Sequence, residues 1–285
     1  GAQVYVSRAG EVAADLGIGA MEPGSSRPWL SATKAVTAVA AARLWEQGMF
    51  ALDDRVADFV PGFERGGKDG VTIRHLLTHT GGFRFSEELE PGWVPGDKAG
   101  YHPRTGFAAL AEVLHQVDGR SFVEIATQDV LAPLGIAAVF TDPDNAVSAG
   151  LSGPMRELAK LYEALLDGGR GVISRETIAE FTRRHRSAMF DHTFGAIVDM
   201  GLGFILDSKE HGRIDVPYGY GPHASPGAFG HGGSQSCTGF ADPQHNLCVA
   251  VMFDSMPGEK PHQQRMFATL AAVYEDLGLA GASEA

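Results

Sequence analysis

The sequence predicts an α/β (α+β) fold in which one antiparallel sheet, assembled from both ends of the chain, is flanked by terminal helices. Strand-like apolar runs occur near the start, helix-like spacing fills the middle, and strong strand patterns return near the end. Such a sheet buries its faces against helices. We therefore expect one domain over residues 1–285, with a sheet-containing lobe at 1–50 and 195–285 and an inserted helical lobe at 51–194.

The first elements are a hairpin and a helix. Short apolar runs at 4–7 and 12–17 surround the turn dipeptide Ala9-Gly10 and predict two paired strands. A helix is predicted over 35–47. In the middle of the chain, apolar residues recur at helical spacing between Gly- and Pro-rich turns. The helices predicted there cover 71–77, 107–117, 122–131, 155–166 and 175–184.

The last third of the chain returns to strands. Strand signals appear at 201–206 and strengthen from Phe229 onward. Residues 237–241 and 247–253 flank Asp-Pro-Gln-His-Asn, a sequence of turn formers, and predict a second hairpin. An amphipathic helix is predicted over 263–277. Cysteines occur once on each of these two strands, and a chain without any further cysteine favours two buried thiols over a disulfide.

Composition narrows the class of function. The chain has 285 residues, 44% of them apolar and 20% charged, as in a globular protein. A formal net charge of -12 and the lack of a basic run argue against a nucleic-acid partner. No apolar run is long enough for a membrane span. No signal peptide is visible, which favours a cytoplasmic location, although the Gly-Ala start indicates a trimmed N-terminus.

Ser31-Ala32-Thr33-Lys34 places a hydroxyl and an amine three residues apart at the start of the first predicted helix. Side chains at i and i+3 share a helical face, so the two groups come within reach of each other. A helix N-terminus disfavours an ammonium, which helps Ser31 act as a nucleophile and Lys34 as a neutral base. Taken alone, the pattern is more typical of a capping serine followed by a solvated lysine.

Four further segments follow this pair in a set order: LDDRV at 52–56, VTIRHLLTHTGG at 71–82, YHP at 101–103 and FGHGG at 229–233. At these separations they resemble the serine β-lactamase-like family. That family includes class C β-lactamases, D-Ala-D-Ala carboxypeptidases, β-lactamase-like carboxylesterases and transacylases. The resemblance covers nearly the whole chain and implies a β-lactamase-like fold.

The resemblance also implies roles for individual residues. Ser31 corresponds to the nucleophile and Lys34 to its partner base. Tyr101 matches the tyrosine of the second motif, and a phenol near an ammonium ionises more easily and can relay protons. The backbone N–H groups of Ser31 and Ser234 correspond to the oxyanion hole.

His231-Gly232-Gly233 matches the third motif of the family. The two glycines are expected to let substrate approach the strand edge closely. His231 is expected to hydrogen-bond the catalytic network or the substrate. The alternative for His231 is an ordinary histidine packed beside a Gly-rich bend.

Two departures from the β-lactamase pattern bear on the substrate. Tyr101 is followed by His102 and Pro103 instead of ending the motif in Asn, and the cationic lysine of the third motif is replaced by His231. That lysine is suited to binding a β-lactam carboxylate. Both changes are typical of the esterase and transacylase branch. We assign His102, with the two third-motif glycines, to substrate binding.

Aromatic and histidine residues near the motifs leave alternatives open. Loop aromatics, among them Trp93, form either the wall of an apolar acyl pocket or ordinary core, and we assign Trp93 to substrate binding. The others are Trp29, Phe83 and Phe85. His75 and His79 stand at i, i+4 spacing without a carboxylate partner, so no metal is expected, and His79 is expected to satisfy buried backbone groups. No phosphate-binding glycine motif follows a strand, so no cofactor is expected.

The sequence therefore predicts a serine acyl hydrolase or acyltransferase that works through an acyl-enzyme on Ser31, with a carboxylesterase as the leading hypothesis. Its partners are a small-molecule ester or amide and, for a transacylase, an amine or alcohol acceptor. A D-Ala-D-Ala carboxypeptidase or β-lactamase would use the same chemistry with a different pocket. A non-catalytic binding homologue is the rival from another class. The residues do not predict an oligomeric state.

Overall fold

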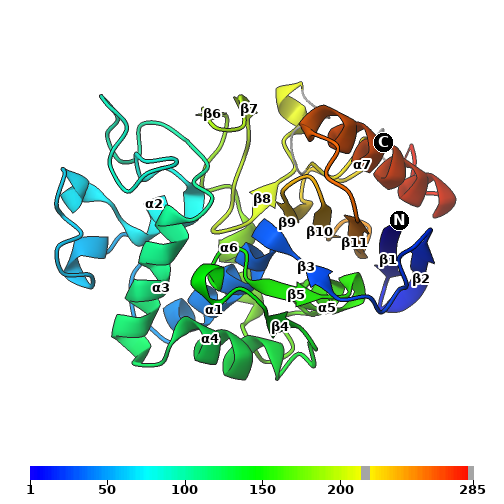
Figure 1. The fold of residues 1–285 in the computed structure, drawn as a ribbon, viewed down its shortest axis with the longest axis horizontal. Coiled ribbons are helices and arrows are strands. Elements are labelled where there is room, and N and C mark those ends of the chain that lie inside the picture. The colour runs from blue at the N-terminus through cyan, green and yellow to red at the C-terminus, as the bar shows by residue number, and fades with distance from the viewer. Residues whose placement is uncertain (213–218, 282–285) are drawn as a thin grey trace.

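The computed structural model describes residues 1–212 and 219–281, and its centre is a six-stranded antiparallel sheet (Figure 1). The spatial order of the strands is β2-β1-β11-β10-β9-β8. The predicted mixed fold with an antiparallel sheet is confirmed, and two smaller sheets accompany the main one. The strand bounds are β1 (Ala2–Arg8), β2 (Glu11–Ile18), β8 (Ile205–Leu206), β9 (Phe229–Gly233), β10 (Cys237–Asp242) and β11 (Leu247–Phe253).

The sheet joins the two ends of the described chain. Ala9 and Gly10 both have positive φ, 52° and 82°, as a two-residue type I′ hairpin requires. They connect β1 to β2, and β1 also pairs with β11, with Val4 opposite Val251. The N-terminal strand therefore lies between its own hairpin partner and a strand more than two hundred residues later in the sequence.

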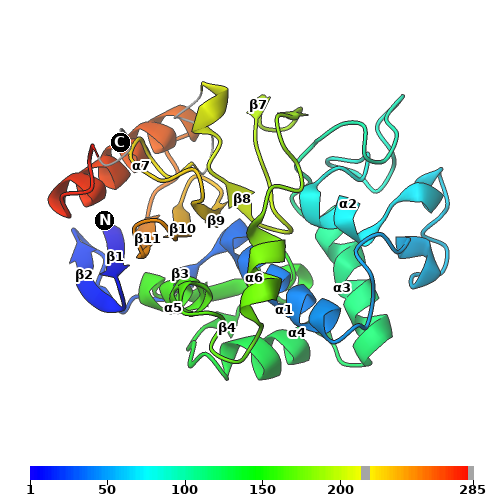
Figure 2. The same ribbon diagram turned by 180° about the vertical axis from the view of Figure 1, so that it is seen from behind.

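Helices cover both faces of the sheet, and both views show one group of helices on each side of it (Figures 1 and 2). Alternate residues of β11 point to opposite faces. Val249 and Val251 pack with Leu270 and Tyr274 of α7 (Glu259–Asp276). Cys248, Ala250 and Met252, which alternate with these valines, face the main core instead, which contains α1 (Lys34–Glu46) and α5 (Met155–Leu166).

The helical region packs around α1. Helix α1 is rich in alanine and buried on almost every side, so neighbouring helices approach it closely. Residues 122–131, predicted as one helix, form α4 followed by a π-helical segment. Helix α5 falls within the range expected for the helical lobe, yet it packs against the sheet. The other helices are α2 (Ile73–Thr78), α3 (Thr105–Asp118), α4 (Phe122–Ile125) and α6 (Arg175–Thr182).

Several short elements have no sequence signal. A small sheet joins three two- or three-residue strands in the order β3-β5-β4, and a two-stranded hairpin rises beside the main sheet. Only the end of the strand predicted at 201–206 forms, as β8. Helix α7 begins four residues before its predicted start at 263. The short strands are β3 (Arg27–Pro28), β4 (Val139–Phe140), β5 (Leu151–Gly153), β6 (Phe190–Asp191) and β7 (Ala196–Ile197).

The two cysteines are free and buried, as favoured from the sequence. They lie on the paired strands β10 and β11, but the register places Cys237 opposite Met252 and Cys248 opposite Ala241. The two thiols are therefore several positions apart along the ladder and do not face each other.

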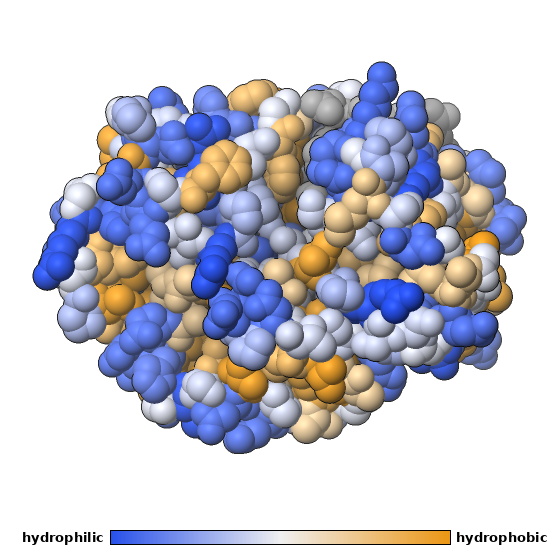
Figure 3. Space-filling model, in the orientation of Figure 1, coloured by the Kyte–Doolittle hydropathy of each residue, from blue (hydrophilic) through white to orange (hydrophobic). Residues whose placement is uncertain are grey.

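The surface of the molecule is mainly polar on the side shown in Figure 3, where apolar side chains form scattered groups between hydrophilic ones. Within the described residues, no helix combines the length and the apolar character that crossing a membrane requires.

Candidate active site

Ser31 lies in a 3₁₀ turn, Leu30–Thr33, that leads directly into α1. The turn is held in place by Trp29, whose backbone N–H donates to the Leu151 carbonyl (2.8 Å) and whose indole Nε1 donates to the Gly153 carbonyl (2.9 Å). Because a 3₁₀ helix has three residues per turn, side chains at i and i+3 lie directly above one another. The Nζ of Lys34 consequently lies 3.4 Å from the Oγ of Ser31.

Lys34 is completely buried, and this burial lowers the pKa of its amine from 10.5 to about 7. Its Nζ donates to the carbonyl oxygens of Pro103 (2.7 Å) and Ser148 (3.0 Å). A neutral amine has two N–H bonds and one lone pair. If the two carbonyls take both N–H bonds, the lone pair remains for the proton of Ser31.

Tyr101 is buried beside this pair, with its ring centroid 5.4 Å from the Nζ of Lys34. Its ring stacks on Phe194 at 4.7 Å. The backbone N–H of Tyr101 donates to the carboxylate of Asp191, which also accepts from the backbone N–H groups of Thr193 (2.9 Å) and Phe194 (3.0 Å). One buried carboxylate thus fixes the tyrosine and the β6–β7 turn together.

The charge of that carboxylate is balanced inside the protein. Asp191 forms an ion pair of 3.1 Å with Arg186, and neither side chain has any exposed surface. Arg186 also donates to the carbonyls of Val198 and Thr78. Removing one partner of such a pair leaves an uncompensated buried charge, so both residues are needed for this arrangement.

A cavity of about 420 Å³ opens at Ser31. Three residues predicted for the site, Ser31, Tyr101 and Ser234, meet at this cavity, and Lys34 lies behind Ser31. The described lining residues are Ser31, Phe85, Tyr101, Pro103, Thr193, Phe194, Ser234, Glu259 and Gln263.

Comparison with known proteins places this arrangement in a family. The Beta-lactamase family model matches residues 1–273, which is nearly the entire chain. The chain belongs to the beta-lactamase family. The family and the similar solved structures comprise serine hydrolases. The family resemblance expected from the sequence motifs is therefore confirmed.

Similar proteins carry several names within this family. The chain is 22% identical to the esterase/beta-lactamase LipL of Mycobacterium tuberculosis, over 79% of this chain and 68% of LipL. It is 27% identical to penicillin-binding protein 4 of Amycolatopsis lactamdurans over 54% of this chain, a match that spans only about half (49%) of that relative. A solved beta-lactamase from Mycobacterium bovis superposes with a TM-score of 0.80 at 25% identity, covering 96% of this chain and 94% of that one.

Three ring-bearing side chains predicted for the site, those of His102, His231 and Trp93, do not line the cavity in this beta-lactamase family chain. His102 is fully buried, accepts a hydrogen bond from the Gly106 N–H (3.2 Å) and packs on the ring of His79. His231 is also fully buried, 6.0 Å from the Tyr101 ring centroid. Trp93 is half-buried and packs against His192.

Burial also decides the charge of these histidines. It lowers the pKa of His102 and of His231 to about 3, with the nearby Lys34 amine contributing in each case. Both rings are therefore neutral at physiological pH. His79 accepts a hydrogen bond from the His102 backbone N–H, as expected of a histidine that satisfies buried backbone groups, and its φ of 57° ends α2, so it does not continue the helix from His75.

Gly233, at the end of β9, lies where two segments of the chain approach each other too closely for a larger residue. A Cβ on Gly233 would lie 2.4 Å from the Trp29 carbonyl oxygen and 2.8 Å from the Sγ of Cys237. The sequence suggested that the third-motif glycines make room for substrate. The crowding at Gly233 gives a different reason, because glycine lets β9 and the turn bearing Ser31 pack together. Gly232 precedes it in β9 and does not line the cavity.

The remaining walls of the cavity include residues that sequence reasoning missed. Thr193 and Phe194 come from the β6–β7 turn, and Glu259 and Gln263 come from the first turns of α7. Pro261 is the signal that could have placed the helix start earlier, because proline is tolerated in the first turn of a helix. Of the loop aromatics, Phe85 lines the cavity, whereas Trp29 and Phe83 are buried in the core.

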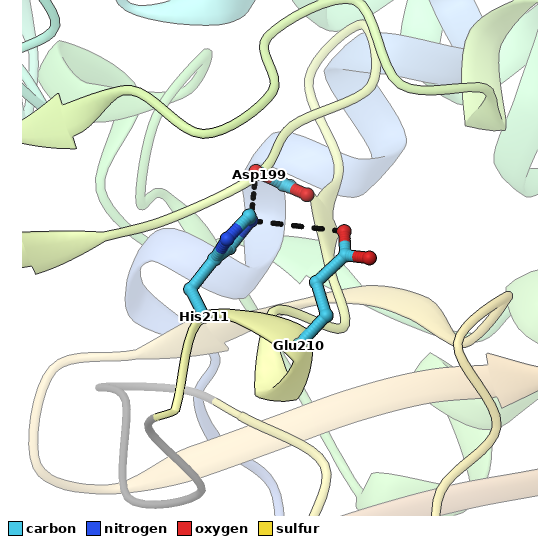
Figure 4. A group of neighbouring side chains, drawn as sticks. All are labelled: Asp199, Glu210 and His211. Carbon is cyan, nitrogen blue, oxygen red and sulfur yellow. Dashed lines mark hydrogen bonds and ion pairs between the residues drawn. The ribbon is translucent and has the colours of Figure 1, made fainter.

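Asp199, Glu210 and His211 form the one described group whose residue types could hold a metal ion (Figure 4). Both carboxylates point toward the Nε2 of His211, at 3.0 Å from Asp199 and 3.7 Å from Glu210. Arg184 already pairs with both acids, at 2.9 Å and 3.4 Å. The guanidinium supplies the positive charge that a metal would bring, so this group is a salt-bridge cluster away from the cavity.

Proposed function

We propose that this chain is a carboxylesterase that forms an acyl-enzyme on Ser31. The observation that carries the proposal is the 3.4 Å approach of a fully buried amine, its pKa lowered to about 7, to a serine hydroxyl at the mouth of a cavity. A serine hydroxyl is a weak nucleophile until a neighbouring base takes its proton. A lysine that is largely neutral at physiological pH supplies such a base.

The reaction has two steps. In the first, the Oγ of Ser31 bonds to the ester carbonyl carbon while its proton passes to the Nζ of Lys34. The oxyanion is held by the backbone N–H groups of Ser31 and Ser234. Collapse of this intermediate breaks the bond to the leaving alcohol, which receives a proton from Lys34 or Tyr101.

In the second step, a water molecule attacks the acyl-enzyme, and the same groups return the proton to Ser31. An amine or alcohol in place of water would give acyl transfer instead. The cavity is open to solvent at Ser31, which is half-buried, so water has access to the acyl-enzyme. Hydrolysis is therefore the function that the geometry supports best.

Intact-mass spectrometry after rapid quenching tests the acyl-enzyme. Wild-type protein mixed with a panel of activated esters, thioesters and a penicillin should gain the mass of one acyl group. Ser31→Ala should gain none and lose essentially all turnover, whereas Ser26→Ala, at an exposed serine just upstream, should behave as wild type. Turnover in Ser31→Ala above roughly a hundredth of wild type would exclude Ser31 as the attacking group.

The same panel separates the competing activities. Product analysis with and without an added amine or alcohol distinguishes hydrolysis from acyl transfer. A stable adduct with the penicillin, but with none of the esters, would favour the peptidase or β-lactamase alternative over the esterase.

A further inference from the structure

The cavity at Ser31 carries an acidic side chain on the wall formed by α7. Glu259 is the first residue of that helix, and Gln263 lies on the same helical face four residues later. Both line the cavity together with Ser31 and Ser234. The nucleophile and this exposed carboxylate therefore face the same solvent-accessible cavity.

The start of α7 is fixed against the turn that carries Ser234. The backbone N–H of Gly258 donates to the Oε1 of Gln235 (2.9 Å), and Arg265 donates to the Gln235 carbonyl oxygen (3.0 Å). Gln235 follows Ser234 directly. Glu259 is consequently anchored, through its neighbours, beside the predicted oxyanion donor.

Glu259 dominates the charge of the cavity. It is the single Asp, Glu, Lys or Arg side chain among the described residues that line the space. The Lys34 amine lies behind Ser31 and is only partly protonated because burial lowers its pKa to about 7. Arg265 is committed to the carbonyl oxygens of Ser255 (2.6 Å) and Gln235. A substrate carboxylate thus finds an acid and no lining cation.

Two aromatic residues, Phe85 and Phe194, also line the cavity. Phe85 is exposed in its loop, and Phe194 is held by stacking on Tyr101. Rings attract a cation to their faces, and a carboxylate nearby adds charge attraction. The formal net charge of -12 over the whole chain also favours the approach of a cationic substrate.

We propose that Glu259 makes the site selective for esters that carry a quaternary or protonated amine, and that it discriminates against substrates with a carboxylate. This inference rests on the proposed function, since it names the substrate class of the same serine esterase site. It also assigns to Glu259 a role in specificity that the catalytic motifs do not contain.

Three para-nitrophenyl esters test the proposal. Their acyl chains share four methylene groups and end in trimethylammonium, tert-butyl or carboxylate. Wild type should show the highest kcat/KM with the cationic ester and the lowest with the anionic one. Glu259→Gln should lower the ratio of the cationic to the neutral ester about fivefold, the size expected for one partly solvated charge pair. Glu259→Lys should make the anionic ester the better charged substrate.

A matched control is Glu11→Gln, which removes the same charge at an exposed position on β2, far from the cavity along the sheet. This variant should keep the wild-type ratio. If both Glu259 variants keep it too, the proposal is overturned. A ratio that falls equally in the control would also overturn it, because the effect would then come from net charge.

A binding measurement keeps this test separate from the proposed function. The stable methyl esters of the same three acids are titrated calorimetrically into Ser31→Ala protein, which needs no turnover. Replacing Glu259 by Gln in this background should weaken the trimethylammonium ester about fivefold and leave the tert-butyl ester unchanged. If no acyl-enzyme forms but the binding preference for the trimethylammonium ester is present, only the proposed esterase activity is refuted. If the acyl-enzyme forms but the binding preference is absent, only the proposal for Glu259 is refuted.

Discussion

Acidification through the neutral range should inactivate the protein by protonating Lys34. Burial lowers the pKa of this amine from 10.5 to about 7, which corresponds to about 5 kcal/mol against the ammonium form. Only the neutral amine has a lone pair for the proton of Ser31. Below pH 7, kcat/KM should therefore fall about tenfold for each pH unit, to roughly a tenth of its plateau at pH 6 and a hundredth at pH 5.

The assay is the hydrolysis of a neutral para-nitrophenyl ester from pH 5 to 9, read at the isosbestic wavelength of the product and corrected for spontaneous hydrolysis. The buried histidines near the site do not titrate within this pH range and so do not contribute to the pH profile. Burial lowers the pKa of His102 and His231 to about 3, and that of His79 well below its usual value, so these rings stay neutral over the whole range. An acid limb near pH 7 is then assigned to Lys34.

A chemical variant checks that assignment. Lys34→Cys, made together with Cys237→Ala and Cys248→Ala, alkylated with bromoethylamine while unfolded and then refolded, replaces one methylene of the side chain by sulfur and lowers the intrinsic pKa of the amine. Alkylation is done on the unfolded chain because the introduced thiol takes the fully buried position of Lys34, and the two native cysteines are removed because they are protected only by their burial in the folded protein. The acid limb should move to lower pH. A wild-type profile that is flat down to pH 5, or a limb that stays in place in the alkylated variant, would refute the reasoning.

Three further substitutions separate chemistry from support. Tyr101→Phe should lower kcat by about 10² to 10⁴ with little change in Tm, and an unchanged kcat would assign the phenol a structural role. Gly233→Ala should lower the free energy of unfolding, measured in urea, by about 1–3 kcal/mol and reduce activity, because the added Cβ collides with the carbonyl oxygen of Trp29, just before the turn that bears Ser31. The control is Gly70→Ala, whose Cβ would meet no atom within 4 Å. Asp191→Asn should lower the free energy of unfolding by about 3 kcal/mol or more, since it leaves Arg186 buried without its partner, and a loss below about 1 kcal/mol would contradict this.

The elements with strong local signals were predictable from the sequence. The Ala9-Gly10 turn requires positive φ at both positions, and alternating apolar residues on either side set the hairpin register. Helix α5 has the bounds predicted from its apolar spacing. The approach of Lys34 to Ser31 also follows from local spacing, although the depth of burial that lowers the lysine pKa depends on distant segments.

The rest of the site depends on contacts that have no local pattern. Thr193 and Phe194 reach the cavity because Asp191 binds their backbone N–H groups, and a single aspartate gives no periodic signal. Glu259 belongs to a first helical turn whose sequence lacks apolar spacing. His102 was assigned to substrate binding from its place after Tyr101, but its side chain is fully buried and its ring packs on His79 in the core.

The insertion of β1 between β2 and β11 has a consequence for biosynthesis. Strand β1 cannot complete its pairing until Leu247–Phe253 has been made, and α7, whose first turns line the cavity, comes later still. Pairing across so large a sequence separation is slow relative to local structure. A nascent chain stalled before β11 should therefore be catalytically silent, and hydrolytic activity should appear only after translation of α7.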